Sequence, residues 1–64
     1  EEFDVPDEFP EDGINLDEMI ANIEKKWLLA SLRATDGKKT AAAQLLTLSF
    51  RSFRYRLIKH GLDR

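Results

Sequence analysis

The densest group of chemically capable side chains lies in the stretch TLSFRSFRYR, residues 47–56, where three arginines and three aromatic residues share ten positions. A guanidinium group can donate two hydrogen bonds to guanine O6 and N7 or to phosphate oxygens. An aromatic ring can contact a base or a sugar. The alternative interpretation is that the aromatic residues belong to a hydrophobic core whose outer surface is charged. The helical elements that carry these residues decide between the two.

The charges are separated along the chain. Residues 1–24 hold ten acidic residues and no Lys or Arg, whereas residues 25–64 hold all ten Lys and Arg against two acidic residues. The net charge of −2 therefore hides an acidic half and a basic half. A basic patch on a small domain is the usual electrostatic sign of a polyanionic partner, and the alternative is a solvated surface that keeps the domain in solution.

Composition argues against several other functions. The chain has no Cys and one His, and no metal-ligand spacing appears, so we expect no metal and no cofactor. We also expect no enzymatic activity, because no nucleophile–base pair or phosphate-binding loop is visible. No apolar run approaches the length of a membrane span and no signal peptide is recognisable, which favours a cytoplasmic protein with no membrane partner.

A helix is predicted at about residues 16–35. Asn15 is a suitable N-cap, Glu18 completes a capping box, and Gly37 is the expected stop. Residues 1–13, acidic and containing two Pro, are expected to form a disordered linker that precedes a domain of residues 14–64.

The apolar residues of this helix fall on two faces. One repeats at spacings of three and four, and the other includes Leu28 and Leu32. Because a chain of 64 residues is short for burying both, we predict that one face covers its own domain and the other binds a second copy. The predicted dimer interface consists of Leu16, Ile20, Ile23, Trp27 and Ala30.

The remaining residues predict two further helices, at about 39–46 and 49–60. The first is rich in Ala, a short break follows at Thr47, and Ser49 can cap the second. Two helices joined by so short a turn, with small residues where they cross, predict a helix-turn-helix. The expected fold is therefore all-α, with three helices and a C-terminal helix-turn-helix.

In a helix-turn-helix the second helix enters the major groove and its outward residues meet base edges. With Phe53 turned into the core, the predicted base-reading residues are Ser49, Phe50, Arg51, Arg54 and Tyr55. The predicted phosphate contacts lie on the flanks and at the start of the preceding helix: Lys39, Thr40, Ser52, Arg56 and Lys59. For Phe50, burial in the core and contact with a thymine methyl group are equally open.

The segment GKKTAAAQLLTLSFRSFRYRLIKHGL, residues 37–62, resembles the Fis-type helix-turn-helix that closes sigma-54-dependent bacterial enhancer-binding activators of the NtrC class. Its stretch FRSFRYRL looks most like the pilus-gene regulator (PilR-like) branch, whose members are response regulators of two-component systems. The matches to the family pattern are Gly37, Thr40, Ala42, Ala43, Leu45, Leu46, Leu48, Ser49, Ser52, Phe53, Arg54, Arg56, Leu57, Gly61 and Leu62.

The resemblance implies a transcriptional activator whose first helix makes the dimer and whose acidic segment leads from an AAA+ ATPase domain absent from this chain. There are two departures from the family pattern. Lys38 stands where the family usually has Asn, so the second helix lacks a good cap. Thr47 stands where it usually has Gly, and a positive φ there would cost a β-branched residue on the order of 1 kcal/mol or more.

The resulting prediction is a dimer that binds specific double-stranded DNA and positions an activator at upstream enhancer-like sites. One alternative is binding of RNA or single strands, with Phe50 and Tyr55 as stacking platforms. Another is a basic helical module that binds an acidic protein.

Overall fold

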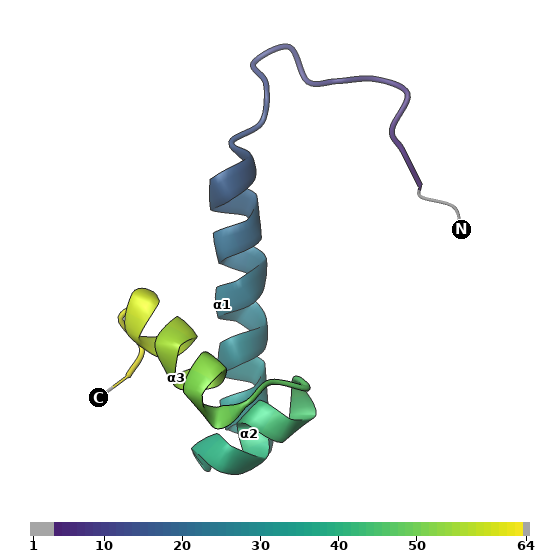
Figure 1. Ribbon diagram of the computed structural model, residues 1–64. Helices are drawn as coiled ribbons and strands as arrows, with labels where there is room; N and C mark the ends of the chain where they lie inside the picture. The colour runs from purple at the N-terminus through teal and green to yellow at the C-terminus, as the bar shows by residue number, and fades with distance from the viewer. Residues whose placement is uncertain (1–3, 64) are drawn as a thin grey trace.

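The computed structural model describes residues 4–63, and within that range it contains three helices and no strand (Figure 1). Helix α1 spans Leu16–Ala34, α2 spans Lys39–Leu45 and α3 spans Phe50–Lys59. The predicted all-α fold is confirmed, and each observed helix boundary lies within one residue of the predicted one. None of these helices has the length and apolar character needed to cross a membrane.

The ends of α1 are set by local hydrogen bonds. The side-chain Oδ1 of Asn15 accepts a hydrogen bond of 3.0 Å from the backbone N–H of Glu18, as the predicted cap requires. At the other end Gly37 has a φ of +83° and donates its N–H to the carbonyl of Leu32 at 2.8 Å. This left-handed residue ends the helix and turns the chain toward α2.

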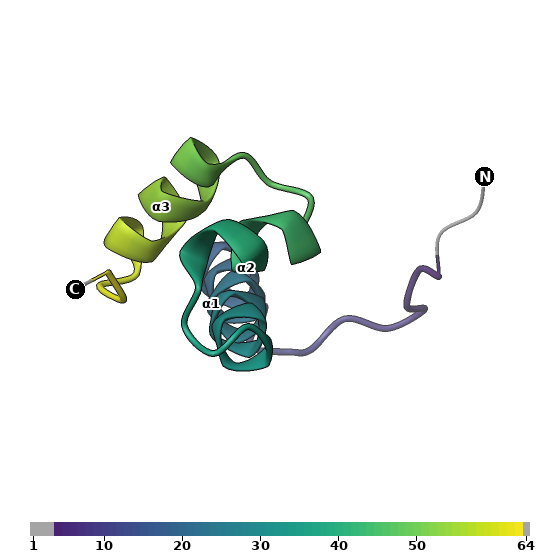
Figure 2. The same cartoon turned by 90° about the horizontal axis from the view of Figure 1, so that it is seen from below.

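The two short helices pack around one end of the long one. Figure 2, which looks along α1, shows α2 crossing its C-terminal end and α3 lying at its side. The N-terminal half of α1 extends beyond both, and the segment before it leads away from the helices (Figure 1). The part of α1 that carries most of the predicted dimer stripe therefore projects from the domain.

The core is small and draws on all three helices. Its buried members are Leu28 of α1, Ala42 and Ala43 of α2, and Phe53 and Leu57 of α3. The two alanines allow α2 to approach its neighbours closely, and Phe53 and Leu57 are both 0% exposed. The partly buried residues packed around this core are Leu32, Leu46, Leu48 and Leu62.

The turn between α2 and α3 contains a strained residue. Thr47 has a φ of +58°, in the left-handed region that a β-branched side chain disfavours. The next N–H, of Leu48, donates to the carbonyl of Ala43 at 2.9 Å, so the chain needs this conformation to close α2. Lys38 makes no side-chain cap to α2, as expected from its replacement of Asn.

The two apolar faces of α1 have different environments. Leu28 is buried and Leu32 packs against the core, so the predicted domain-facing stripe is confirmed. On the other face Ile20 and Ile23 are each 54% exposed and Trp27 is 52% exposed. This second face has no cover within the described residues.

Candidate nucleic-acid interface

The rotation of α3 is set by its two buried residues. Phe53 and Leu57 lie against α1 and α2, so the opposite side of the helix faces solvent. Ser49 begins the helix by accepting a hydrogen bond of 3.1 Å at Oγ from the N–H of Ser52. Ser49 is thus the N-cap of α3, and it is exposed at the N-terminal end of this solvent-facing side.

Four of the five predicted base-reading residues come together on that face. Phe50, Arg51, Arg54 and Tyr55, with Ile58, line a shallow hollow of about 380 Å³. Phe50 is 46% exposed, which makes it a wall of the hollow and leaves Phe53 as the aromatic residue of the core. The arrangement places guanidinium donors beside apolar surface, the combination that suits the edges of base pairs.

Two of the predicted DNA-contacting cations share one carboxylate. The Nζ of Lys39 lies 2.5 Å from Oδ1 of Asp63, and the Nε of Arg54 lies 3.4 Å from Oδ2. The hydrogen bond from Lys39 is the main cause that lowers the pKa of Asp63, and Arg54 acts in the same direction. This pairing was not predicted from the sequence, in which Asp63 counted only toward the net charge. The available signal was Gly61, which turns the chain back toward α3.

A second carboxylate gathers cations from the end of α3. Glu24 of α1 lies 2.8 Å from Nε of Arg56, 3.0 Å from Nζ of Lys59 and 2.7 Å from Nε2 of His60. The hydrogen bond from His60 is the largest cause that lowers the pKa of Glu24 to about 2. Contacts with Lys59 and Arg56 add to the effect and partial burial opposes it. The sequence predicted an end of α3 near His60 but did not predict this cluster.

The flanking residues therefore differ in how free they are. Arg56 also donates to the carbonyl and the hydroxyl of Ser52, so both residues are engaged within the domain. Arg51 forms no ion pair among residues 4–63, and Thr40 is exposed near the start of α2.

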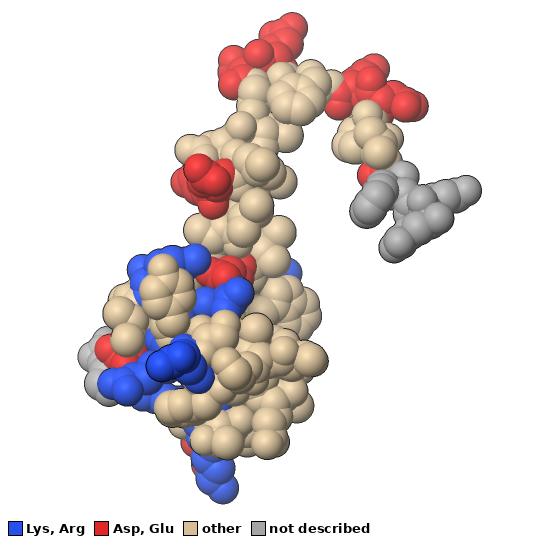
Figure 3. Space-filling model, viewed as in Figure 1, with Lys and Arg blue, Asp and Glu red and all other residues tan. Residues whose placement is uncertain are grey.

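Lys and Arg gather over the end of the molecule that holds α3, and Asp and Glu lie mainly along the N-terminal segment (Figure 3).

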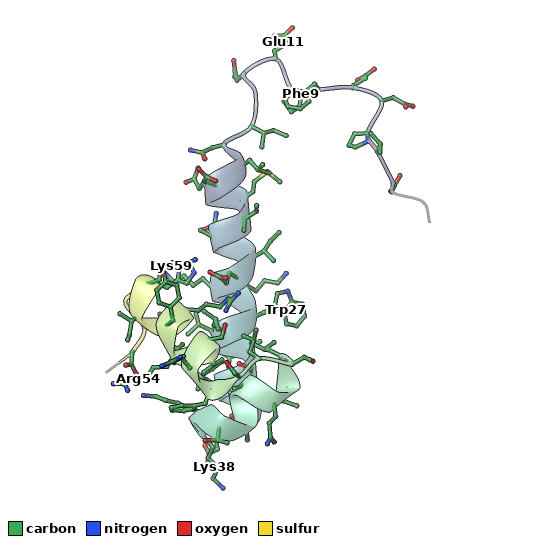
Figure 4. All side chains as sticks on the ribbon, viewed as in Figure 1. Phe9, Glu11, Trp27, Lys38, Arg54 and Lys59 are labelled. Carbon is green, nitrogen blue, oxygen red and sulfur yellow. The ribbon has the colours of Figure 1, made fainter. Side chains whose placement is uncertain are left out.

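The basic face and the exposed apolar stripe point in different directions. Arg54 and Lys59 project on the α3 side, whereas Trp27 projects on the opposite side of α1 (Figure 4). Around Trp27 a second hollow of about 290 Å³ continues from α1 onto the end of α2, where Leu45 and Leu46 line it. A partner on this apolar surface would leave the basic face open.

Comparisons with known proteins match the chain to a family model and to a curated protein. A family model described as bacterial regulatory protein, Fis family, matches residues 19–60. The response regulator protein PilR of Pseudomonas aeruginosa is 49% identical over 49 residues, which are 77% of this chain and 11% of that protein. The chain thus spans about a tenth of the length of this curated relative. No solved structure gives a significant match.

Proposed function

This chain belongs to the Fis family of bacterial regulatory proteins, and from that premise we propose that it binds specific double-stranded DNA as a dimer, with α3 in the major groove. The family implies DNA binding by a transcription regulator. The observation that carries the finer proposal is the exposed face of α3. Four predicted base-reading side chains line one hollow there, while the buried side of the helix anchors it.

Each side chain of that face has a distinct role in the proposed complex. Arg51 and Arg54 present donors suited to guanine O6 and N7, and half-exposed Phe50 suits a thymine methyl group. Tyr55, 64% exposed, would contact a phosphate or sugar, and Ser49 would meet the groove at the helix start. The proposed phosphate contacts are Lys39, Thr40, Ser52, Arg56 and Lys59, which hold the helix in register without reading sequence.

The exposed stripe of α1 supports the dimer. Leu16, Ile20, Ile23 and Trp27 are each more than half exposed, and Ala30 continues the stripe toward the hollow beside α2. A contiguous apolar surface of this kind on a small domain favours a partner. A second copy would present a second α3 to the DNA, about one helical turn or roughly 34 Å away.

The larger setting follows from the relative's printed description as a response regulator. We propose that this non-enzymatic module positions a longer activator at upstream enhancer-like sites. Residues 14–64 would be the DNA-binding and dimerisation domain, and residues 1–13 the acidic linker from an AAA+ ATPase domain. Residues 1–3 and 64 lie outside the described part of the chain.

Selection of bound duplexes from a random pool tests the proposal. We expect a two-fold-symmetric motif, and we expect the selected duplex to compete better than either of its single strands. Preferential binding of the single strands would support the RNA or single-strand alternative instead. Failure to shift any duplex at low salt would overturn DNA binding and favour the protein-interaction alternative.

A further inference from the structure

Asp63 is held in place by the chain reversal that follows α3. Gly61 adopts a φ of +70°, and the next N–H, of Leu62, donates to the carbonyl of Leu57 at 2.7 Å. The Leu62 side chain then packs against the core. These contacts return the backbone to the domain, so that the carboxylate of Asp63 meets the start of α2 and the middle of α3.

The carboxylate is more enclosed than the cations it binds. The Asp63 side chain is 12% exposed, against 36% for Lys39 and 59% for Arg54. Only two acidic residues, Asp36 and Asp63, follow residue 24, and Asp36 forms no ion pair within residues 4–63. Asp63 is therefore the acidic residue of the basic half that forms ion pairs with residues predicted to contact DNA.

The contact uses one edge of the Arg54 guanidinium. Its Nε faces Asp63, and the terminal amino groups make no hydrogen bond within the described residues. Those terminal groups can form the fork that binds the two acceptors of guanine. A carboxylate that binds Nε restricts the rotation of the guanidinium group, so the Arg54 side chain loses less conformational freedom when its terminal groups bind a base.

We propose that Asp63 is a specificity-determining residue for DNA recognition, because it orients Arg54 toward a base and restrains Arg54 from binding phosphates at random sequence. The inference rests on the proposed function. On random duplex Arg54 would exchange the carboxylate for a phosphate and leave Asp63 beside the negatively charged backbone, so the contact would add little net attraction. On the cognate site Arg54 keeps Asp63 at Nε and gains the base at its terminal groups.

The test compares Asp63→Asn with the parent chain on a selected duplex and on a random duplex, over a range of salt concentrations. Up to two cations become free, so the slope of log K against log salt on random duplex should steepen by about 1–2. At low salt the affinity for random duplex should rise about 3- to 10-fold. The affinity for the selected duplex should rise less or fall, so that the ratio between the two decreases.

Two control variants show whether the effect depends on the carboxylate at position 63 or only on the net charge of the chain, and unfolding measurements test for loss of the fold. Asp12→Asn makes the same change in net charge within the exposed segment before α1, and it should leave the ratio unchanged. Asp63→Glu keeps the charge and should retain most of the parent ratio. Thermal unfolding of each variant establishes that all are folded at the assay temperature.

The outcomes distinguish this inference from the proposal beneath it. If Asp63→Asn changes both affinities by the same factor, or changes neither, the role assigned to Asp63 is wrong although DNA binding stands. If the parent chain itself does not prefer the selected duplex, the proposed function fails and the inference fails with it.

Discussion

The carboxylate of Glu24 lies 2.7 Å from Nε2 of His60, which is 36 positions further along the chain, and the contact joins the middle of α1 to the end of α3. Arg56 and Lys59 approach the same carboxylate from α3. The helix proposed to read DNA is thereby attached to the helix proposed to form the dimer. This contact ties the direction of α3 to that of α1, which in a dimer affects the spacing of the two recognition helices.

Glu24 should make stability depend on pH in the acid range. Its folded pKa of about 2 lies below the ordinary value of 4.5, so its stabilisation is fully present above pH 4.5 and is lost as the pH falls through 2. Glu24→Gln should lower stability at pH 7 by about 1–2 kcal/mol, since partial exposure screens the ion pairs. Urea unfolding between about pH 2 and 6 should show a flatter profile for the variant. A parallel profile would contradict this, and Glu11→Gln is the control for charge.

Thr47→Gly should stabilise the domain. The φ of +58° costs a β-branched residue on the order of 1 kcal/mol, and glycine removes that cost. Glycine also raises the conformational entropy of the unfolded chain, which offsets part of this gain. Chemical denaturation should therefore show a net increase in the free energy of unfolding of less than about 1 kcal/mol. Asp36 has the same φ of +58° but is a residue type that tolerates it better, so Asp36→Gly should gain less. An equal or larger gain at Asp36 would show that strain at Thr47 is not the cause.

Substitution of Phe53 should mainly lower stability, whereas substitution of Phe50 should mainly weaken DNA binding. Phe53→Ala removes a fully buried ring and should cost about 3–5 kcal/mol, which is enough to unfold much of so small a domain. Phe50→Ala removes a ring that is 46% exposed and should cost about 1 kcal/mol or less while weakening binding to the selected duplex. Thermal denaturation and duplex titration measure the two effects. Greater destabilisation by Phe50→Ala would place Phe50 in the core.

Ile23→Glu should convert the proposed dimer to a monomer. The side chain is 54% exposed in the single chain, so the change leaves the core intact but puts a charge into the apolar stripe. Sedimentation should show a fall in mass at a concentration where the parent is dimeric. Val5→Glu, at a residue that is 71% exposed before α1, is the matched control. Unchanged sedimentation of Ile23→Glu would exclude this face as the interface.

Arg54→Ala should weaken binding to the selected duplex by about 1–3 kcal/mol, because a bidentate contact to a base is lost. The loss on random duplex should be smaller. Arg33→Ala, in the last turn of α1, makes the same change in charge at a residue outside the proposed DNA contacts and serves as the control. An equal loss on both duplexes would assign Arg54 to phosphate contact.

Local sequence signals were sufficient for the helices and for the face that α3 exposes. Asn15, Gly37, Ser49 and Gly61 act through neighbours only a few residues away, so helix ends can be inferred without knowledge of the fold. The spacing of Phe53 and Leu57 likewise defines the buried side of α3 through the helical period alone. The family usually has Gly at the position of Thr47, which raised the prospect of a positive φ there, and the structure shows one.

Only the tertiary structure decided which predicted contact residues are already paired. The carboxylate of Asp63 is 24 positions from Lys39, and that of Glu24 is 32 positions from Arg56. Such ion pairs depend on how α1, α2 and α3 cross, and residue spacing within one helix carries no information about that crossing. The sequence by itself determined three helices, a basic half and an outward face of α3. The packing of the core determined which cations on that face are restrained and which, like Arg51, form no ion pair within the described residues.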